Sequence, residues 1–144
     1  MNINQTILKP KPQITQWYIV DAKQHILGKM STKIANLLNG KQNTHYLPHL
    51  MNDIYIIVIN SKDIKLTGKK KEQKIYRRHS GQPGGLKSET LNELQKRKPN
   101  KIIQQAVKGM LPKNKLGKKM LTRLKIYPNN VHPYTENNKY FIHL

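Results

Sequence analysis

The sequence contains no cysteine among its 144 residues. This absence excludes disulfide bonds, thiolate zinc sites and cysteine nucleophiles, and nothing points to an oxidising compartment. Long apolar runs are also missing, because the longest, Ile54–Ile59, is far shorter than the roughly 18 residues that cross a bilayer. The N-terminal stretch has neither an apolar signal core nor an arginine. We therefore expect no targeting peptide and a protein that works where it is translated.

Acidic residues are scarce, with 7 Asp and Glu against 27 Lys and Arg and a net charge of +20. The excess is concentrated between Lys62 and Lys125, where 20 basic residues accompany four acids. A merely soluble surface mixes the two signs, whereas a phosphate-binding surface concentrates positive charge. A membrane-surface role would need exposed Trp or Phe opposite the cations, and the single Trp and single Phe both lie outside the basic stretch. The charge pattern predicts a nucleic-acid partner and no membrane.

The length fits one domain with a core of its own. Residues 1–16 lack periodicity and are interpreted as an extended N-terminal arm. Trp17–Asp21 is aromatic and β-branched, which is typical of a strand. An apolar stripe over residues 30–38 predicts a helix that Gly40 would end. The continuous apolar run Ile54–Ile59 indicates a strand covered on both faces, so the order strand, helix, strand predicts a parallel sheet between helices.

The basic half begins with a short strand-like segment at Lys74–Arg78. The glycines and proline of residues 81–85 then predict a loop. Ser88 and Thr90 are both candidate N-caps of a short helix, and the spacing from Thr90 to Glu93 fits a capping box. A helix is therefore expected shortly after the loop.

The clearest helical periodicity covers residues 102–111, and a second amphipathic helix is predicted over 116–124. In this second helix the leucines would face inward, so Lys118, Lys119 and Arg123 would face solvent. Lys119 and Arg123 are four residues apart and would repel each other unless phosphates lay between them. This cationic face is the strongest phosphate site that the helical pattern predicts.

Catalytic and metal sites are disfavoured by the same sequence. The pair Gly28–Lys29 stands between a predicted strand and helix, but Lys23 and Met30 occupy the places where a phosphate-binding loop needs Gly and Ser or Thr. His45 and His49 have helical spacing with a proline between them, so an ordinary loop is favoured over a zinc site. With seven acids, no catalytic constellation is visible. A phosphate- or nucleotide-handling enzyme of doubly wound type stays open as the alternative function.

Several short motifs follow one another in a distinctive order. They are Trp17–Ala22, Leu27–Lys29, Tyr46–His49, Ile56–Asn60, Lys65–Gly68, His79–Gly81 with Gly84 and Gly85, Leu116–Gly117, Leu124–Tyr127 and His132–Pro133. The most specific is Ala106–Pro112, AVKGMLP, which precedes the basic helix. From Gln16 to Tyr134 the chain resembles the L-thirteen family of large-subunit ribosomal proteins.

The resemblance implies a single three-layer α/β/α domain at residues 17–127, around a small, mostly parallel sheet. Residues 1–16 and 128–144 would be extended arms, and the C-terminal one follows no pattern. The resemblance also implies no enzymatic activity, no cofactor, no metal and no small-molecule substrate. The expected partners are large-subunit rRNA, bound early in subunit assembly, and neighbouring large-subunit ribosomal proteins.

The predicted rRNA-binding residues combine the basic runs, the glycine loop and the C-terminal motif. They are Lys69, Lys70, Lys71, Arg77, Arg78, His79, Gly81, Gly84, Gly85, Lys108, Lys113, Lys115, Lys118, Lys119, Arg123, Lys125, His132 and Tyr134. Two departures from the family pattern stand out. Asn52 replaces a usual Gly, and residues 128–136 replace a histidine-containing motif, so a stacking Tyr134 takes the place of a histidine.

The composition also indicates an origin. The chain has 23 Lys against 4 Arg, with 14 Asn and 16 Ile, which is typical of a protein from an AT-rich genome. Residues 79–85 are similar to plastid and cyanobacterial members of the family. A plastid-encoded protein of the chloroplast stroma, working within the ribosome, is therefore favoured, with the bacterial cytoplasm as the alternative location.

Overall fold

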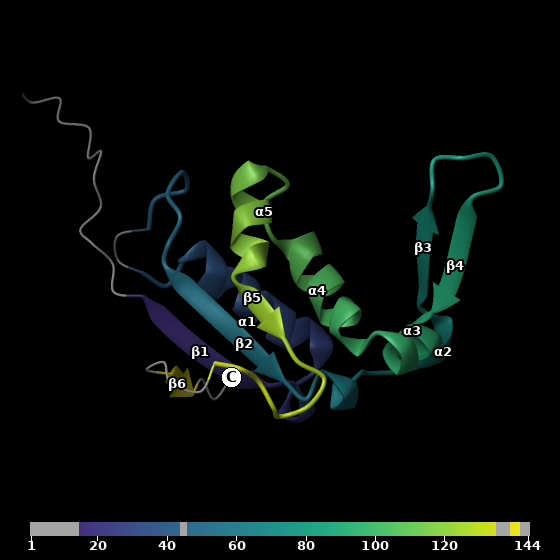
Figure 1. Ribbon diagram of the computed structural model, residues 1–144, viewed down its shortest axis with the longest axis horizontal. Helices are drawn as coiled ribbons and strands as arrows, with labels where there is room; N and C mark the ends of the chain where they lie inside the picture. The colour runs from purple at the N-terminus through teal and green to yellow at the C-terminus, as the bar shows by residue number, and fades with distance from the viewer. Residues whose placement is uncertain (1–14, 44–45, 135–138, 142–144) are drawn as a thin grey trace, which may run out of the picture.

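The computed structural model describes residues 15–43, 46–134 and 139–141 (Figure 1). Its elements are β1 (Gln16–Asp21), η1 (Ala22–Gln24), α1 (Leu27–Asn39), β2 (Ile54–Ile59), η2 (Ser61–Asp63), α2 (Lys70–Gln73), β3 (Ile75–His79), β4 (Leu86–Thr90), α3 (Leu91–Arg97), α4 (Pro99–Met110), α5 (Lys115–Thr122), β5 (Leu124–Ile126) and β6 (Lys139–Phe141). The predicted arm at 1–16 falls outside the described residues except for its last two, and β1 begins at Gln16.

The main sheet has the strand order β5-β2-β1-β6 and is parallel throughout. Val20 lies opposite Val58, and Ile56 lies opposite Leu124. The chain moves in one direction from β1 to β2 to β5, so right-handed crossovers place α1 and the long β2–β5 connection on the same face. The α/β class and the small, mostly parallel sheet are therefore confirmed.

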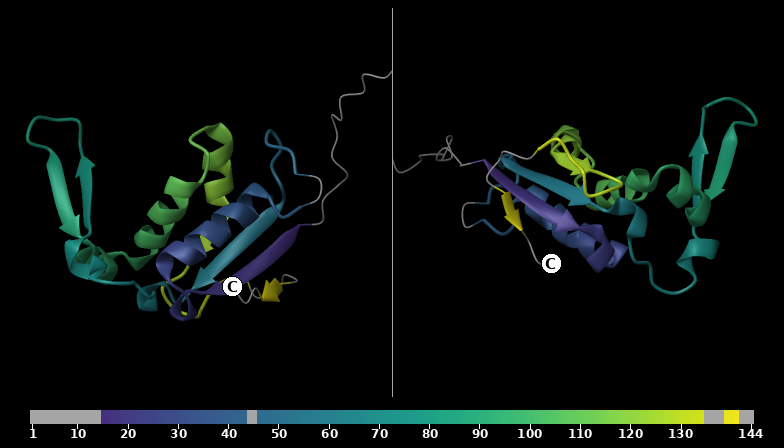
Figure 2. Two further views of the ribbon diagram at one scale, coloured as in Figure 1. Left: turned by 180° about the vertical axis from the view of Figure 1, so that it is seen from behind. Right: turned by 60° about the horizontal axis from the view of Figure 1, so that its bottom comes forward.

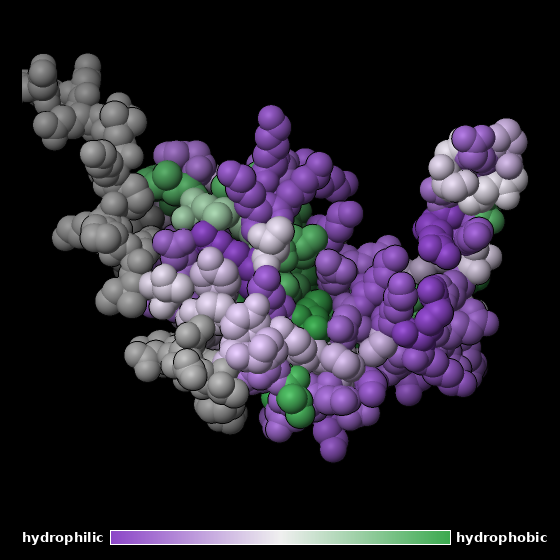
Figure 3. Space-filling view, in the orientation of Figure 1, coloured by the Kyte–Doolittle hydropathy of each residue, from purple (hydrophilic) through white to green (hydrophobic). Residues whose placement is uncertain are grey.

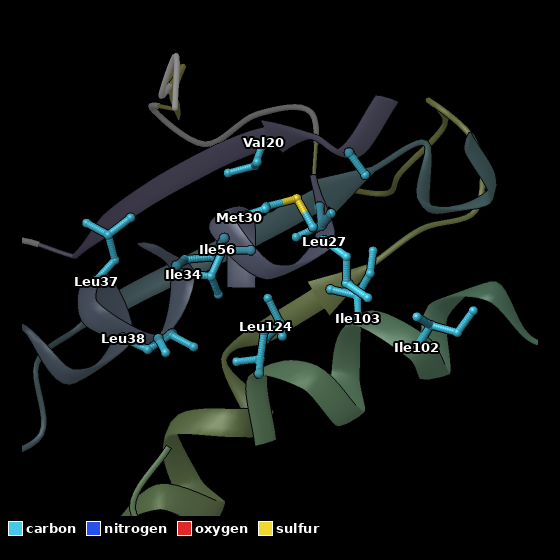
Figure 4. Close-up of a cluster of buried hydrophobic side chains, with 14 of the residues drawn as sticks. Val20, Leu27, Met30, Ile34, Leu37, Leu38, Ile56, Ile102, Ile103 and Leu124 are labelled. Carbon is cyan, nitrogen blue, oxygen red and sulfur yellow. The ribbon is translucent and has the colours of Figure 1, made fainter. Parts of the chain in front are cut away.

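The hydrophobic core lies between this face of the sheet and the helices α1 and α4 (Figure 4). Met30 and Ile34 of α1 meet Val20 and Ile56 of the sheet, while Ile103 reaches the core from α4. All five side chains are at most 1% exposed. Burying each apolar side chain contributes about 1.5–3 kcal/mol, so this layer is the main source of stability.

The opposite face of the sheet carries aromatic side chains. Trp17 of β1 stacks on Tyr55 of β2 with ring centroids 4.5 Å apart. Tyr134, from the segment after β5, lies 5.2 Å from Trp17. In the part of the chain that the structure describes, this layer is an irregular C-terminal segment instead of a helix, because 128–134 has prolines and no helical periodicity.

The helix α1 ends as its sequence predicts. Gly40 follows it with φ 73° and ψ 21°, a left-handed conformation that glycine adopts at low cost. Asn52 is buried, and its Nδ2 donates a hydrogen bond of 3.2 Å to the Asn39 carbonyl. A Cβ on Gly40 would stand 1.6 Å from that nitrogen. The Asn52 side chain thus satisfies an end carbonyl of α1 and requires glycine at position 40.

An antiparallel hairpin, β3 with β4, stands away from the parallel sheet at one end of the molecule (Figure 2). The short strand predicted near Lys74–Arg78 is β3, but β4 at Leu86–Thr90 was not expected, nor was the single turn α2. The capping box is confirmed: Thr90 Oγ1 accepts from the Glu93 amide, and Glu93 Oε2 accepts from the Thr90 amide.

The C-terminal end of the predicted basic helix is wrong. The helix α5 stops at Thr122, and Leu124–Ile126 forms β5 beside β2. Leu124 fits the apolar period of the helix, but it also fits the alternating pattern of the strand Leu124–Ile126. The sequence therefore does not distinguish the two assignments at this residue. The tail expected to be irregular contains β6, which pairs in parallel with β1. Within the described ranges, no helix is both long and apolar enough to cross a bilayer.

Candidate nucleic-acid interface

A cleft of about 960 Å³ separates the hairpin from α4. In the space-filling view the surface is hollowed between the hairpin and the body, and the surrounding side chains are mostly hydrophilic (Figure 3). The cations that line the cleft are Arg77, Arg78, Lys87, Arg97, Lys101, Lys108 and Lys113, and its single lining acid is Glu89. We call this surface the cationic cleft. Its charge suits a polyanion whose phosphates pass between two walls.

The hairpin wall is set by strand alternation. Arg78 pairs with Lys87, and Tyr76 pairs with Glu89, so these four side chains share one face of the hairpin. Tyr76 is half-buried against the hydrophobic core, which turns this face toward α4. The result is that Arg78 and Lys87, both exposed, point into the cationic cleft.

The opposite wall is set by the period of α4. Ile102, Ile103 and Val107 are fully buried, which fixes the rotation of the helix. Lys101 and Lys108 are seven residues apart, two helical turns, so both lie on one exposed side. The two lysines are spaced along the cleft at about 10 Å, from a rise of 1.5 Å per residue.

One ion pair lies at the corner between β4 and α3. Arg97 Nε donates to Glu89 Oε1 at 3.0 Å, and Arg97 Nη2 donates to Glu89 Oε2 at 2.6 Å. This bidentate hydrogen bonding lowers the pKa of Glu89, with further help from the charges of Arg97, Arg78 and Lys101. The same hydrogen bonds raise the pKa of Arg97. Both groups are therefore ionised at neutral pH.

The predicted glycine loop forms the tip of the hairpin. Gly81 and Gly84 have φ values of 90° and 71°, which confirms a turn with left-handed positions. A Cβ on Gly85 would stand 2.0 Å from Ser80 Oγ, so the turn closes on that glycine. His79 is exposed, and its Nδ1 accepts a hydrogen bond from the Gly81 amide. These residues are brought together at the far end of the hairpin.

Other predicted cations form two exposed groups outside the cleft. Lys69, Lys70 and Lys71 lie at α2, where the turn begins. Lys115, Lys118 and Lys119 lie on α5, where buried Gly117 and Met120 fix the inner side of the helix. Figure 1 shows α5 beside α4, so this second group extends the positive surface beyond Lys113.

The predicted orientation of Arg123 is wrong. Arg123 follows α5, and its side chain is 12% exposed. Its Nη2 donates to Asp53 Oδ1 at 2.8 Å, and its guanidinium carbon lies 5.3 Å from the centroid of the Tyr55 ring. Because the chain leaves the helix at Thr122, Arg123 turns to the aromatic face of the sheet. It is therefore not the outward neighbour of Lys119.

Three further predicted residues also lie toward the aromatic face. Lys125 alternates with the core residues Leu124 and Ile126 in β5, so its side chain takes the opposite side. The His132 ring centroid lies 6.1 Å from that of Tyr127, and Tyr134 lies against Trp17. Burial, and then the neighbouring Tyr134, raise the pKa of Tyr127. The structure does not bring these residues to the cationic cleft.

Sequence reasoning missed three cations of the cleft, Lys87, Arg97 and Lys101. A signal for Lys101 was present, since the helical period of residues 102–111, extended by one residue, places Lys101 on the polar side with Lys108. Lys87 needed the unexpected strand β4, and Arg97 needed the fold at the β4–α3 corner. Within the described residues no three His, Asp or Glu side chains gather as metal ligands, and His45 of the considered pair lies outside them.

Comparison with known proteins gives a consistent result. Residues 15–133 match the family described as Ribosomal protein L13. The chain is 51% identical over 132 residues to "Large ribosomal subunit protein uL13c" of Gracilaria tenuistipitata var. liui, covering 92% of each chain. It is 55% identical over 118 residues to the uL13c of Porphyra purpurea, covering 82% of this chain and 83% of the relative. It is 49% identical over 133 residues to the uL13 of Nostoc sp. strain PCC 7120, covering 92% and 88%.

Proposed function

Because the chain belongs to the Ribosomal protein L13 family, we propose that it is a structural constituent of the large ribosomal subunit that binds rRNA through the cationic cleft. The family is a structural component of the ribosome and not an enzyme, so the nucleotide-handling alternative is not retained. We further propose that the chain joins the subunit early in assembly and contacts neighbouring large-subunit proteins.

The observation that carries the proposal is the charge of the cationic cleft. The hairpin and α4 supply five of the seven Lys and Arg side chains of the cleft, and α3 and the segment after α4 supply one each, against one carboxylate, Glu89. That carboxylate is already paired with Arg97, so six cations face the cleft without a partner acid in its lining. Folding would not favour such a concentration of like charge, whereas RNA phosphates neutralise it and release counterions.

The rRNA-binding surface extends beyond the cleft. The exposed lysines of α2 and α5 and the hairpin tip, with His79, Gly81 and Gly84, would follow the same RNA backbone on either side. Arg123, Lys125, His132 and Tyr134 are left out of this surface, since they lie toward the aromatic face of the sheet. Backbone contacts of this kind position a protein on folded RNA by shape.

The proposed location is the plastid ribosome. Relatives from Gracilaria tenuistipitata var. liui, Porphyra purpurea and Pyropia yezoensis are all named uL13c, with 51–55% identity to this chain. The cyanobacterial relatives are similar at 46–50%. The lysine-rich and asparagine-rich composition favours an organellar gene over a bacterial one.

A binding titration with large-subunit rRNA tests the site. Lys101→Glu with Lys108→Glu should weaken binding strongly, and Lys23→Glu with Lys41→Glu serves as the matched control, because neither of those exposed lysines lines the cleft. Each phosphate contact contributes a log–log salt slope of about −0.7 to −0.9, so six contacts give a slope near −4 to −5. Equal losses in the two double variants, or a flat salt titration, would reject the cleft as the rRNA site.

A further inference from the structure

Glu89 is an acidic side chain in a surface that is otherwise positive, and attraction to phosphates does not explain its presence there. A carboxylate beside RNA repels phosphate, so Glu89 would be expected to weaken binding. Yet Glu89 lines the cleft and is held there by two hydrogen bonds from Arg97. The pair also ties up Arg97, which would otherwise be free to meet a phosphate.

The position of the pair suggests what it does. The strand β4 ends at Thr90, and α3 begins at Leu91, so the chain turns a corner there without a connecting loop. Glu89 stands just before this corner, and Arg97 is the last residue of α3. The two side chains therefore span the corner and join the hairpin to the far end of the short helix, where α4 follows.

Few other described contacts hold the hairpin at that angle. The capping box of Thr90 and Glu93 fixes the first turn of α3 to the end of β4 but does not reach the far end of that helix. At its base the Leu91 amide donates to the Lys74 carbonyl, and Tyr76 packs against the core. Apart from Tyr76, Glu89 and Thr90, the residues of both strands are exposed, with Ile75 at 51% and Leu86 at 59%. A two-stranded hairpin is marginal in water on its own. The width of the cleft, set by the angle between hairpin and α4, depends on the contacts at this corner.

Resting on the proposed function, we propose that Glu89 is a positioning residue for rRNA: its bidentate pair with Arg97 fixes the angle of the hairpin to α4 and thereby matches the cationic cleft to folded rRNA. The pair thus lowers the affinity of the cleft for polyanions in general and raises its affinity for rRNA folded in one shape. Without the ion pair, rRNA binding must also order the hairpin, and this entropic cost lowers the affinity for rRNA. A flexible polyanion adapts to any hairpin angle, so its affinity rises when the negative charge of Glu89 is removed.

The test uses the full chain and two probes, a large-subunit rRNA transcript and heparin. Glu89→Gln should bind rRNA at least about fivefold more weakly than the parent, the lower end of ordinary coupling between sites. The same variant should bind heparin as tightly as the parent or more tightly. Glu72→Gln is the matched control: it removes one acid from α2, outside the cleft, and should bind both probes no more weakly than the parent.

The exchange Glu89→Arg with Arg97→Glu separates positioning from charge. It keeps the net charge and allows the pair to form with reversed polarity, so rRNA affinity should return to within about threefold of the parent, as expected for a surface pair that is remade. Exposed pairs contribute little to stability, so the melting temperature of Glu89→Gln should stay close to that of the parent. A loss of rRNA binding at unchanged melting temperature supports the positioning role.

Two results would overturn it. If Glu89→Gln binds rRNA as tightly as Glu72→Gln does, Glu89 is only a repulsive charge. If the exchanged pair binds as weakly as Glu89→Gln, the effect belongs to the identity of one side chain and not to the pair. Either failure is distinct from failure of the proposed function, in which the Lys101→Glu, Lys108→Glu variant would retain rRNA binding.

Discussion

Replacing Arg123 with alanine tests whether this residue holds the fold or faces RNA. Its bond to Asp53 is 2.8 Å long, and Asp53 is 48% exposed, so the loss of this half-solvated pair costs about 1 kcal/mol. The contact with the Tyr55 ring adds about 0.5–1 kcal/mol. Burial of the aliphatic stem adds roughly another 1 kcal/mol. The free energy of unfolding should therefore fall by about 2–3 kcal/mol.

The measurement is urea denaturation followed by fluorescence. Trp17 is the only tryptophan and stacks on Tyr55, so its emission reports the aromatic face directly. A companion cycle with Asp53→Asn should give a coupling energy of about 1 kcal/mol between the two residues. Lys119→Ala, on the exposed side of α5, is the control and should change stability by no more than about 0.5 kcal/mol. Unchanged stability of Arg123→Ala together with lost rRNA binding would refute the reasoning.

Three other outcomes are expected. Ile103→Ala, at a fully buried position between α4 and the sheet, should lower the free energy of unfolding by about 2–5 kcal/mol, measured by urea denaturation. The exposed control Lys119→Ala should leave that free energy nearly unchanged. Gly84→Val, at φ 71°, should weaken rRNA binding more than it lowers the melting temperature, and Gly84→Asn should be milder, because asparagine tolerates this conformation; equal binding by all three proteins would leave only a plain turn. Because Arg97 lowers the pKa of Glu89, the pair stabilises the fold above the ordinary pKa of a glutamate and loses that effect as pH falls through the lowered value. This contribution to stability is small because the pair is exposed, so the sharper readout is the Glu89 carboxyl itself. Arg97→Gln should raise the pKa of Glu89 toward its ordinary value, and an unchanged Glu89 pKa in that variant would count against the pair.

The sequence predicted the core of the fold because its elements have strong local patterns. The stripe that ends at Gly40 has a helical period with a glycine at its boundary, and the run Ile54–Ile59 is continuously apolar. Both elements appear where expected. The capping box at Thr90 is equally local, since its two partners are three residues apart. Interactions between residues close together in the chain can be predicted from the sequence alone.

The missed elements depend on distant contacts. The strand β4, with Lys87, Ser88 and Glu89, has little intrinsic strand preference and forms because β3 pairs with it. Arg123 was misplaced for a similar reason, since its partner Asp53 is 70 positions away in the sequence. Lys101, by contrast, was within reach, because extending the predicted helix by one residue places it on the polar side with Lys108. Local pattern thus located the basic region but not the cleft inside it.

A tethered cleavage probe tests the central claim, that the cationic cleft holds rRNA, most directly. The chain has no cysteine, so Gln104→Cys and Gln24→Cys each provide one thiol for an iron chelate that cuts nearby RNA. Both glutamines are exposed, but Gln104 lines the cleft and Gln24 lies in η1. In reconstituted large subunits, we expect strong, clustered cuts in large-subunit rRNA from position 104 and weaker cuts from position 24. Absence of cuts from position 104, in particles that contain the protein at parental levels, would contradict the account.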